Sequence, residues 1–172
     1  MDLLETTVIG YHSYEEYADS FVQNIKFRGK TLSEWEEEIE LPNVGQDCDL
    51  HELKEANAIY IVVLKKVINN LAYAKTTLKA CDMHYKSKIN TVSNSIMERW
   101  VQDNPGKRVM GADTLKSLAT KECQAEYVAL NIAESFVEFW QTQNEKLKLF
   151  DSRLSGIGYI TALEDKHQHR LY

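Results

Sequence analysis

The sequence is poor in residues that interrupt helices and has no long apolar run. It holds only seven glycines and two prolines among 172 residues, and this scarcity favours long ordered helices over flexible linkers. No run of 18 or more apolar residues occurs, so no transmembrane helix is expected. The first ten residues carry acidic side chains where a secretory signal carries lysine or arginine. We therefore expect no export, and a cytoplasmic protein.

The motifs of common enzymes are also missing. The chain contains no Gly-rich phosphate loop, no G-x-S-x-G elbow and no H-E-x-x-H pair. Its three cysteines, Cys48, Cys81 and Cys123, are odd in number and widely spaced, which is unlike a disulfide framework or a zinc site. We predict reduced cysteines that pack as small apolar residues, and a protein with no enzymatic activity, cofactor or metal site.

One stretch, from about His51 to Trp100, carries the strongest pattern. Apolar residues recur there every three or four positions, a mean spacing of about 3.6, which is the period of an α-helix. No glycine or proline interrupts the run. The pattern comprises Leu53, Ala56, Tyr60, Val63, Val67, Leu71, Ala74, Leu78, Cys81, Tyr85, Ile89, Val92 and Ile96.

A turn and a second helical pattern follow. Pro105-Gly106 is a turn dipeptide, and Asp113 is suited to cap the next helix. That helix is predicted from Leu115 to about Leu163, with Gly156 and Gly158 as places where it could bend or end. Two long helices joined by a tight connection fold back as an antiparallel hairpin.

The first fifty residues predict a small acidic arm with two helices. Ser13 can open the first, which should fade at Gly29. Thr31 and Glu34 have capping-box spacing and start the second, Ser33 to Glu40. The predicted fold is all-α: an acidic helical arm over 1–50 and a long α-hairpin domain over 51–172.

The net charge of −6 conceals three regions of different sign. Residues 1–58 hold fourteen acidic and four basic side chains, a net of −10. Residues 59–121 hold eleven basic and four acidic ones, a net of +7, and the remainder carries −3. The acidic run 34–40 is typical of a solvated helix face. A contact with a basic partner, including the chain's own middle third, is the alternative.

The hairpin carries more apolar residues than two helices can bury between them. We predict that copies of the chain associate, although a monomeric four-helix bundle is the alternative. The residues predicted for the oligomer interface are Phe136, Phe139, Trp140, Phe150 and Ile157.

The basic middle third suggests a nucleic-acid interface. Cations neutralise phosphates and flat rings stack on bases, which together suit a single strand. Lysines on the outside of a long helix are also ordinary solubilising residues, so charge alone leaves the question open. The residues predicted to bind nucleic acid are Lys75, Lys79, Lys86, Lys88, Lys107, Arg108 and Tyr85.

A family resemblance supports that interpretation. The segment 150–160, FDSRLSGIGYI, resembles the C-terminal helix of the UvsY-type recombination mediators of tailed phages, in which a Ser-Arg or Asn-Arg pair precedes two spaced isoleucines. The segment 80–88, ACDMHYKSK, is similar to the end of that family's long central helix. The resemblance covers roughly residues 50–165. The acidic arm and the acidic net charge depart from it.

The resemblance implies a non-enzymatic homo-oligomeric phage protein in the host cytoplasm. Such a protein binds single-stranded DNA, contacts the single-strand-binding protein and the recombinase, and helps load the recombinase. Two other functions are compatible with the residues. The acidic arm could bind and inhibit a host defence protein, or the chain could be a structural helical oligomer.

Overall fold

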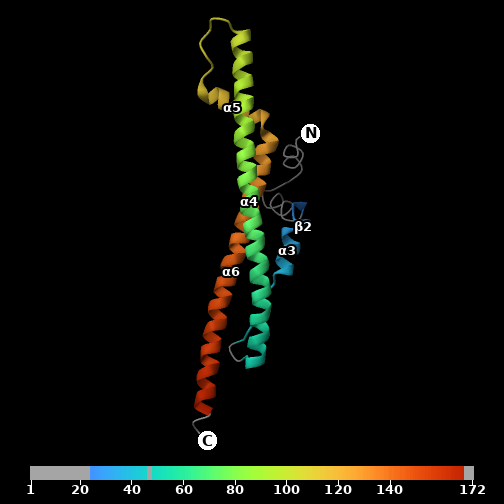
Figure 1. Ribbon diagram of the computed structural model, residues 1–172, viewed down its shortest axis with the longest axis vertical. Helices are drawn as coiled ribbons and strands as arrows, with labels where there is room; N and C mark the ends of the chain where they lie inside the picture. The colour runs from blue at the N-terminus through green and yellow to red at the C-terminus, as the bar shows by residue number, and fades with distance from the viewer. Residues whose placement is uncertain (1–23, 46–47, 169–172) are drawn as a thin grey trace, which may run out of the picture. The chain divides into compact units, whose positions relative to one another are not determined.

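The structure is a computed structural model that describes residues 24–45 and 48–168, with side chains as far as 162. It is mostly helical, which confirms the predicted all-α class (Figure 1). The helices in these ranges are α3 (Leu32–Glu38), α4 (Leu50–Asp103), α5 (Ala112–Glu122) and α6 (Gln124–Gln168). The helix predicted to open at Ser13 lies outside the described residues.

Two short strands, missed by the sequence analysis, precede α3. Strands β1 (Lys26–Phe27) and β2 (Lys30–Thr31) pair antiparallel, with Phe27 opposite Lys30. The two residues that join them both have positive φ, 51° at Arg28 and 87° at Gly29. This conformation matches the twist of paired strands, and glycine adopts it at no steric cost. Gly29 therefore belongs to a strand turn, and the prediction that a helix fades there was wrong.

Helix α3 begins with the predicted capping box. The Thr31 hydroxyl accepts a hydrogen bond from the Glu34 amide at 3.2 Å, and the Glu34 carboxylate accepts one from the Thr31 amide at 2.7 Å. Two amides that a helix start would leave unpaired are satisfied in this way. The helix ends at Glu38, before Pro42 as expected.

The two long helices agree with the sequence pattern except at their junction. Helix α4 spans 54 residues, and α6 continues through Gly156 and Gly158. The predicted second helix is divided in two at Cys123, where the backbone turns to φ −106° and ψ 26°. Asp113 is not the N-cap: Gly111 occupies that position and makes no side-chain hydrogen bond to the helix.

The chain divides into two compact units. Unit 1 contains the described residues up to Ala72 and those from Glu138 onward, and unit 2 is Tyr73–Val137. Each unit therefore holds part of α4 and part of α6. That residues 1–50 and 51–172 form separate domains stays a prediction.

Unit 1 is built around an aromatic cluster. Trp140 of α6 is fully buried, and its ring centroid lies 5.7 Å from that of Phe27 and 5.3 Å from that of Trp35. The Trp35 indole donates a hydrogen bond to the Phe27 carbonyl at 2.7 Å. These contacts hold the strand pair and α3 to α6. Further along the helices, Tyr60 of α4 packs on Phe150 of α6, with ring centroids 6.0 Å apart.

The buried residues of unit 2 include Ile96, Phe136 and Val137 as well as several small side chains. Ala119 of α5 and Cys123 are fully buried, and Ala74 and Ala133 are nearly so. Large side chains contribute at a few places, such as the Tyr85 and Tyr127 rings, whose centroids are 5.8 Å apart.

Candidate functional site

Three of the predicted DNA-binding lysines share one face of α4 within unit 2. Lys75, Lys79 and Lys86 follow one another at spacings of four and seven residues. At about 100° per residue, the three side chains fall within roughly 40° of one another around the helix. All three are exposed. We call this set the lysine face.

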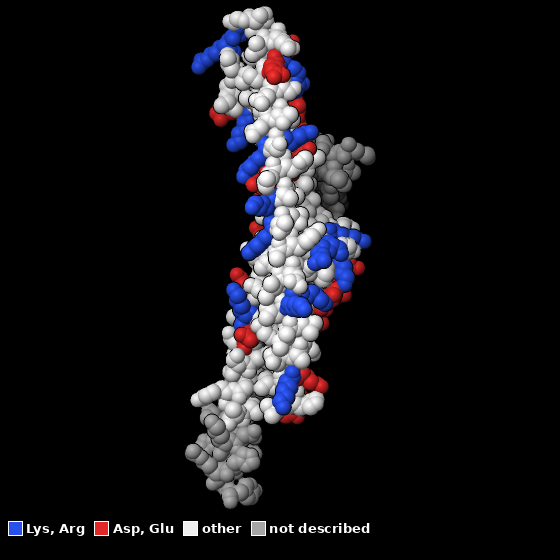
Figure 2. Space-filling view, viewed as in Figure 1, with Lys and Arg blue, Asp and Glu red and all other residues white. Residues whose placement is uncertain are grey.

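One carboxylate belongs to the lysine face. Asp82 lies one turn before Lys86, and its carboxylate oxygen accepts from the Lys86 ammonium at 2.7 Å. The lysine face therefore carries a net charge of about +2 rather than +3. Figure 2 shows basic and acidic side chains interspersed over the visible surface, without one large patch of a single sign. Such a face has the charge to bind phosphates, although its net charge is modest.

The remaining predicted cations lie elsewhere. Lys88 is only two residues from Lys86, but two residues rotate the helix by about 200°, so Lys88 points away from the lysine face. Lys107 and Arg108 are exposed in the connection after α4. There the Lys107 ammonium donates to the Asn104 side chain at 2.9 Å, and the Arg108 carbonyl accepts from the Trp100 indole at 3.3 Å. The seven predicted residues do not form one cluster.

The predicted stacking ring is partly occupied within the protein. Tyr85 is half-buried and packs against Tyr127 of α6. Tyr127 is 40% exposed and so presents more surface to a ligand than Tyr85 does. Tyr127 could not be identified from the sequence, because its contact with Tyr85 depends on how α6 packs on α4.

A groove in unit 2 was also missed. It lies between α4 and the start of α6 and has a volume of about 410 Å³. Its lining combines small apolar side chains with one histidine and one carboxylate. The lining residues are Ala80, Cys81, His84, Ala125, Glu126 and Ala129.

The residues predicted for an oligomer interface are mostly internal. Trp140 is fully buried, and Phe136 and Ile157 are at most 7% exposed. Phe139 and Phe150 are half-buried and pack against Trp140 and Tyr60. These five side chains thus belong largely to the chain's own core, since their packing partners lie within it.

Other apolar side chains of α4 do reach the surface in unit 1. Ile61 is 55% exposed, Val62 63% and Ile68 50%. By the helical repeat, they lie on the side of α4 opposite the buried Val63 and Val67. Ile59 of the same helix is also exposed, at 44%.

The acidic helix α3 makes several ion pairs within unit 1. The Glu36 carboxylate accepts from the Lys146 ammonium at 2.9 Å, and Glu38 pairs with Lys66 at 2.7 Å and also with Lys30. These hydrogen bonds lower the pKa of both carboxyl groups below the ordinary value of 4.5. Lys66 belongs to the basic middle third, so part of the acidic run does contact it.

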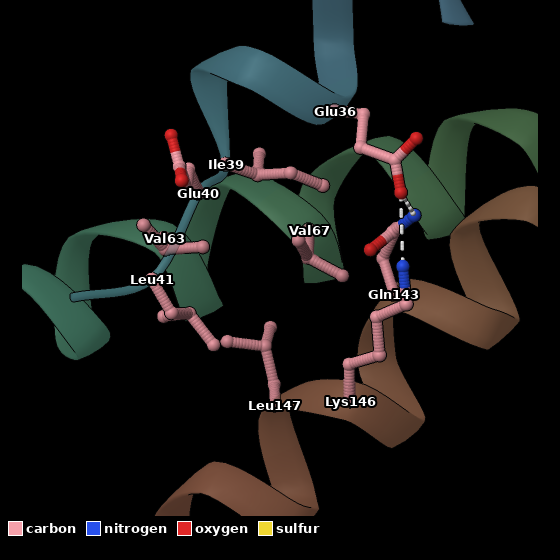
Figure 3. Close-up of a pocket in the computed structure, with 9 residues that line it drawn as sticks. All are labelled: Glu36, Ile39, Glu40, Leu41, Val63, Val67, Gln143, Lys146 and Leu147. Carbon is pink, nitrogen blue, oxygen red and sulfur yellow. Dashed lines mark hydrogen bonds and ion pairs between the residues drawn. The ribbon is translucent and has the colours of Figure 1, made fainter. Parts of the chain in front are cut away.

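A pocket in unit 1 lies beside the Glu36 ion pair (Figure 3). Its volume is about 240 Å³, and Val63, Val67 and Leu147 form part of its apolar wall. The 6%-exposed Gln143 side chain approaches the Glu36 carboxylate at 3.5 Å. The lining contains the Glu36–Lys146 ion pair, the Gln143 amide and the Glu40 carboxylate.

The part of the chain that the structure describes has neither a candidate metal cluster nor a candidate membrane span. The described residues contain no group of three or more His, Cys, Asp or Glu side chains placed to hold a metal ion. Within the same residues, no helix combines the length and apolarity needed to cross a membrane.

Comparison with known proteins gives no match to a protein family, a curated protein or a solved structure.

Proposed function

We propose that this chain is a non-enzymatic single-stranded-DNA-binding protein of the recombination-mediator type, which helps load a recombinase. The observation that carries the proposal is the lysine face. Three exposed lysines lie on one side of a helix, and among the described contacts only Lys86 is paired with an acid. Unpaired cations at helical spacing suit a flexible phosphate backbone, which can follow the helix from one lysine to the next.

The resemblance to UvsY-type mediators supplies the biological setting of this proposal. In that setting the protein acts with a recombinase and a single-strand-binding protein inside a phage-infected cell. It binds and positions these partners, and it performs no chemistry of its own.

Self-association is the second part of the proposal. We infer that α4 and α6 form an antiparallel hairpin and that hairpins associate through the exposed side of α4 at Ile61, Val62 and Ile68. Ile61 and Ile68 are seven residues apart and share a side of the helix, and exposed aliphatic residues in this arrangement are typical of a helix that packs on another chain. Repeating a weak lysine face in each copy would raise the affinity for a long strand by avidity.

The rival function, inhibition of a host protein by the acidic arm, is less well supported. Glu34 caps its own helix, and Glu36 and Glu38 form ion pairs with lysines of the same unit. A partner would have to compete with these contacts. A purely structural oligomer remains the outcome if no DNA binding is found.

Charge reversal of the lysine face tests the DNA-binding function. We expect Lys75→Glu, Lys79→Glu and Lys86→Glu together to weaken binding to single-stranded DNA by at least about tenfold, because three phosphate contacts are lost. The slope of log affinity against log salt should flatten by about two units, at roughly 0.7 per contact. Fluorescence anisotropy of a labelled oligonucleotide at several salt concentrations measures both.

The matched control changes three exposed lysines of unit 1 to glutamate: Lys54 and Lys65 of α4 and Lys148 of α6. It changes the net charge by the same amount, so a comparable loss would show a general charge effect and contradict a specific face. Circular dichroism checks that helicity is kept. Absence of salt-dependent binding by the unmodified protein at about 50 mM salt would overturn the function.

A further inference from the structure

Helix α4 leaves one side uncovered within unit 1. Leu50, Ile61 and Lys65 fall within roughly 60° of one another on that side, which we call the outward side of α4. Leu50 is 50% exposed and Ile61 55%, and the exposed Lys65 has no ion pair among the described contacts. Glu52 and Glu55, the acidic residues of this stretch, lie about 80° or more away around the helix. This side is therefore apolar and basic.

Helix α6 has an outward side of the opposite charge. Glu145, Leu149 and Ile160 again fall within roughly 60° of one another. Leu149 is 73% exposed and Ile160 52%, and the exposed Glu145 has no ion pair among the described contacts. Arg153, at the edge of this side, donates a hydrogen bond to the Val44 carbonyl. The outward side of α6 is therefore apolar and acidic.

The two outward sides match level by level along the helices. Within unit 1, residue numbers rise along α4 as they fall along α6: Tyr60 packs on Phe150, and Val63 lines one pocket with Leu147 (Figure 3). Counting along both helices from these contacts gives three exposed pairs of complementary chemistry at equal heights. The pairs are Leu50 with Ile160, Ile61 with Leu149, and Lys65 with Glu145.

We propose that the outward side of α4 in one copy packs on the outward side of α6 in the next copy, with both copies pointing the same way. In this arrangement the apolar pairs meet, and Lys65 of one copy faces Glu145 of the other. The inference rests on self-association, the second part of the proposed function. It names the surface that the exposed side of α4 binds.

Charge opposes the alternative in which two α4 helices pair with each other. That contact would bring Lys65 and Lys54 of both copies together without an acid to offset them. The α4-to-α6 contact also has a consequence for assembly size. Because each copy uses two different surfaces, a copy bound through one surface can still bind through the other, so association continues beyond two copies.

A charge swap tests the pairing in the full chain. Lys65→Glu sets two carboxylates opposite each other and should weaken association at least about tenfold. Adding Glu145→Lys to that variant restores opposite charges and should restore association. Sedimentation velocity over a range of concentrations measures both variants, and the unmodified protein should give a mass above that of two 19.9 kDa chains.

The matched control combines Lys65→Glu with Glu98→Lys, an exposed acid of α4 in unit 2. It has the same net charge as the swapped variant but should stay dissociated. Circular dichroism checks that helicity is kept in every variant. The DNA-binding control that changes Lys65 is then measured with an oligonucleotide that one copy can hold, because avidity has no part in that binding.

A second variant tests the apolar part of the contact. Leu149→Gln should weaken association, because it removes an apolar side chain from the proposed interface. Met83→Gln is the control: Met83 is 63% exposed on α4 in unit 2, so its loss should leave association unchanged.

The outcomes separate this inference from the self-association on which it rests. A monomeric unmodified protein overturns both. A mass of two chains, a Lys65→Glu variant that associates normally, or a failure of Glu145→Lys to restore association overturns the α4-to-α6 contact and leaves self-association standing.

Discussion

The two units bury very different side chains. Unit 1 packs Phe27, Trp35 and Trp140 into one aromatic cluster and adds ion pairs from α3. Unit 2 buries three alanines and Cys123 together with Ile96, Phe136 and Val137, and α5 has only Ala119 buried. A large buried aromatic contributes several times the stabilisation of a buried methyl group. We infer that unit 1 supplies most of the stability.

This division has a physical reason. A ligand face needs exposed charges and open grooves, and both reduce the apolar area that a unit can bury. Unit 2 carries the lysine face and the alanine-lined groove. Unit 1 has the larger core, and its buried apolar area can compensate for the smaller buried area of unit 2. The predictions below test whether stability is in fact divided so unevenly.

The largest expected effect is the removal of the central indole of unit 1. Trp140→Ala should lower the free energy of unfolding by roughly 3–5 kcal/mol, as for other buried aromatic residues. Trp100→Ala in unit 2 is the matched comparison, because Trp100 is half-buried and donates one hydrogen bond. It should cost only about 1–2 kcal/mol. Urea unfolding followed by circular dichroism measures both, and equal losses would contradict the division.

Local opening should show an intermediate effect. Amides of α5 should exchange with solvent at least about tenfold faster than those of α4 between Ala56 and Val67, a difference of about 1.4 kcal/mol in opening free energy. Helix α5 starts at Ala112, and its N-cap residue Gly111 offers no side-chain hydrogen bond, which leaves the first turn weaker than a Ser, Thr, Asp or Asn cap would. Hydrogen exchange with mass spectrometry resolves the two regions, and slower exchange in α5 would refute the comparison.

The smallest effect concerns acid. Because the pKa values of Glu36 and Glu38 are lowered in the folded protein, their contribution to stability is present above the ordinary value of 4.5 and is lost as the pH falls through the folded values. The two carboxyl groups are partly exposed, so each should contribute a few tenths of a kcal/mol.

We expect the melting temperature to fall by about 1–3 °C more below pH 4.5 in the unmodified protein than in a Glu36→Gln, Glu38→Gln double variant. Added salt at about 0.5 M should shrink this difference, since it screens exposed pairs. Differential scanning calorimetry from pH 7 to pH 3 provides the measurement. An identical acid response of the two proteins would show that α3 is not held by its carboxylates.

The long helices could be predicted because their signal is repeated many times. Thirteen apolar residues at helical spacing placed α4 from about 51 to 100, and the structure has Leu50–Asp103. The break at Cys123 could not be predicted in this way, since neither glycine nor proline marks it. The strands at Lys26 and Lys30 are two residues long, too short to show an alternating pattern.

The candidate site was predicted less completely than the fold. Helical geometry alone places Lys88 and Lys86 on different sides of the helix, so the separation of Lys88 from the lysine face could have been predicted from the residue numbers. The groove could not be predicted, because the side of α6 that faces α4 depends on the position of the break at Cys123. The positions of Ala125, Glu126 and Ala129 follow from that break.

The order of the units along the chain has a consequence for biosynthesis. Unit 1 consists of two stretches separated by the whole of Tyr73–Val137. Trp140, the residue on which its aromatic cluster depends, leaves the ribosome only after unit 2 has been translated, a delay of several seconds at roughly 5–20 residues per second. During that delay Phe27, Trp35 and the apolar side of α4 have no α6 to cover them. The nascent chain should therefore bind a chaperone that recognises exposed aromatic segments, until residues from Glu138 onward emerge.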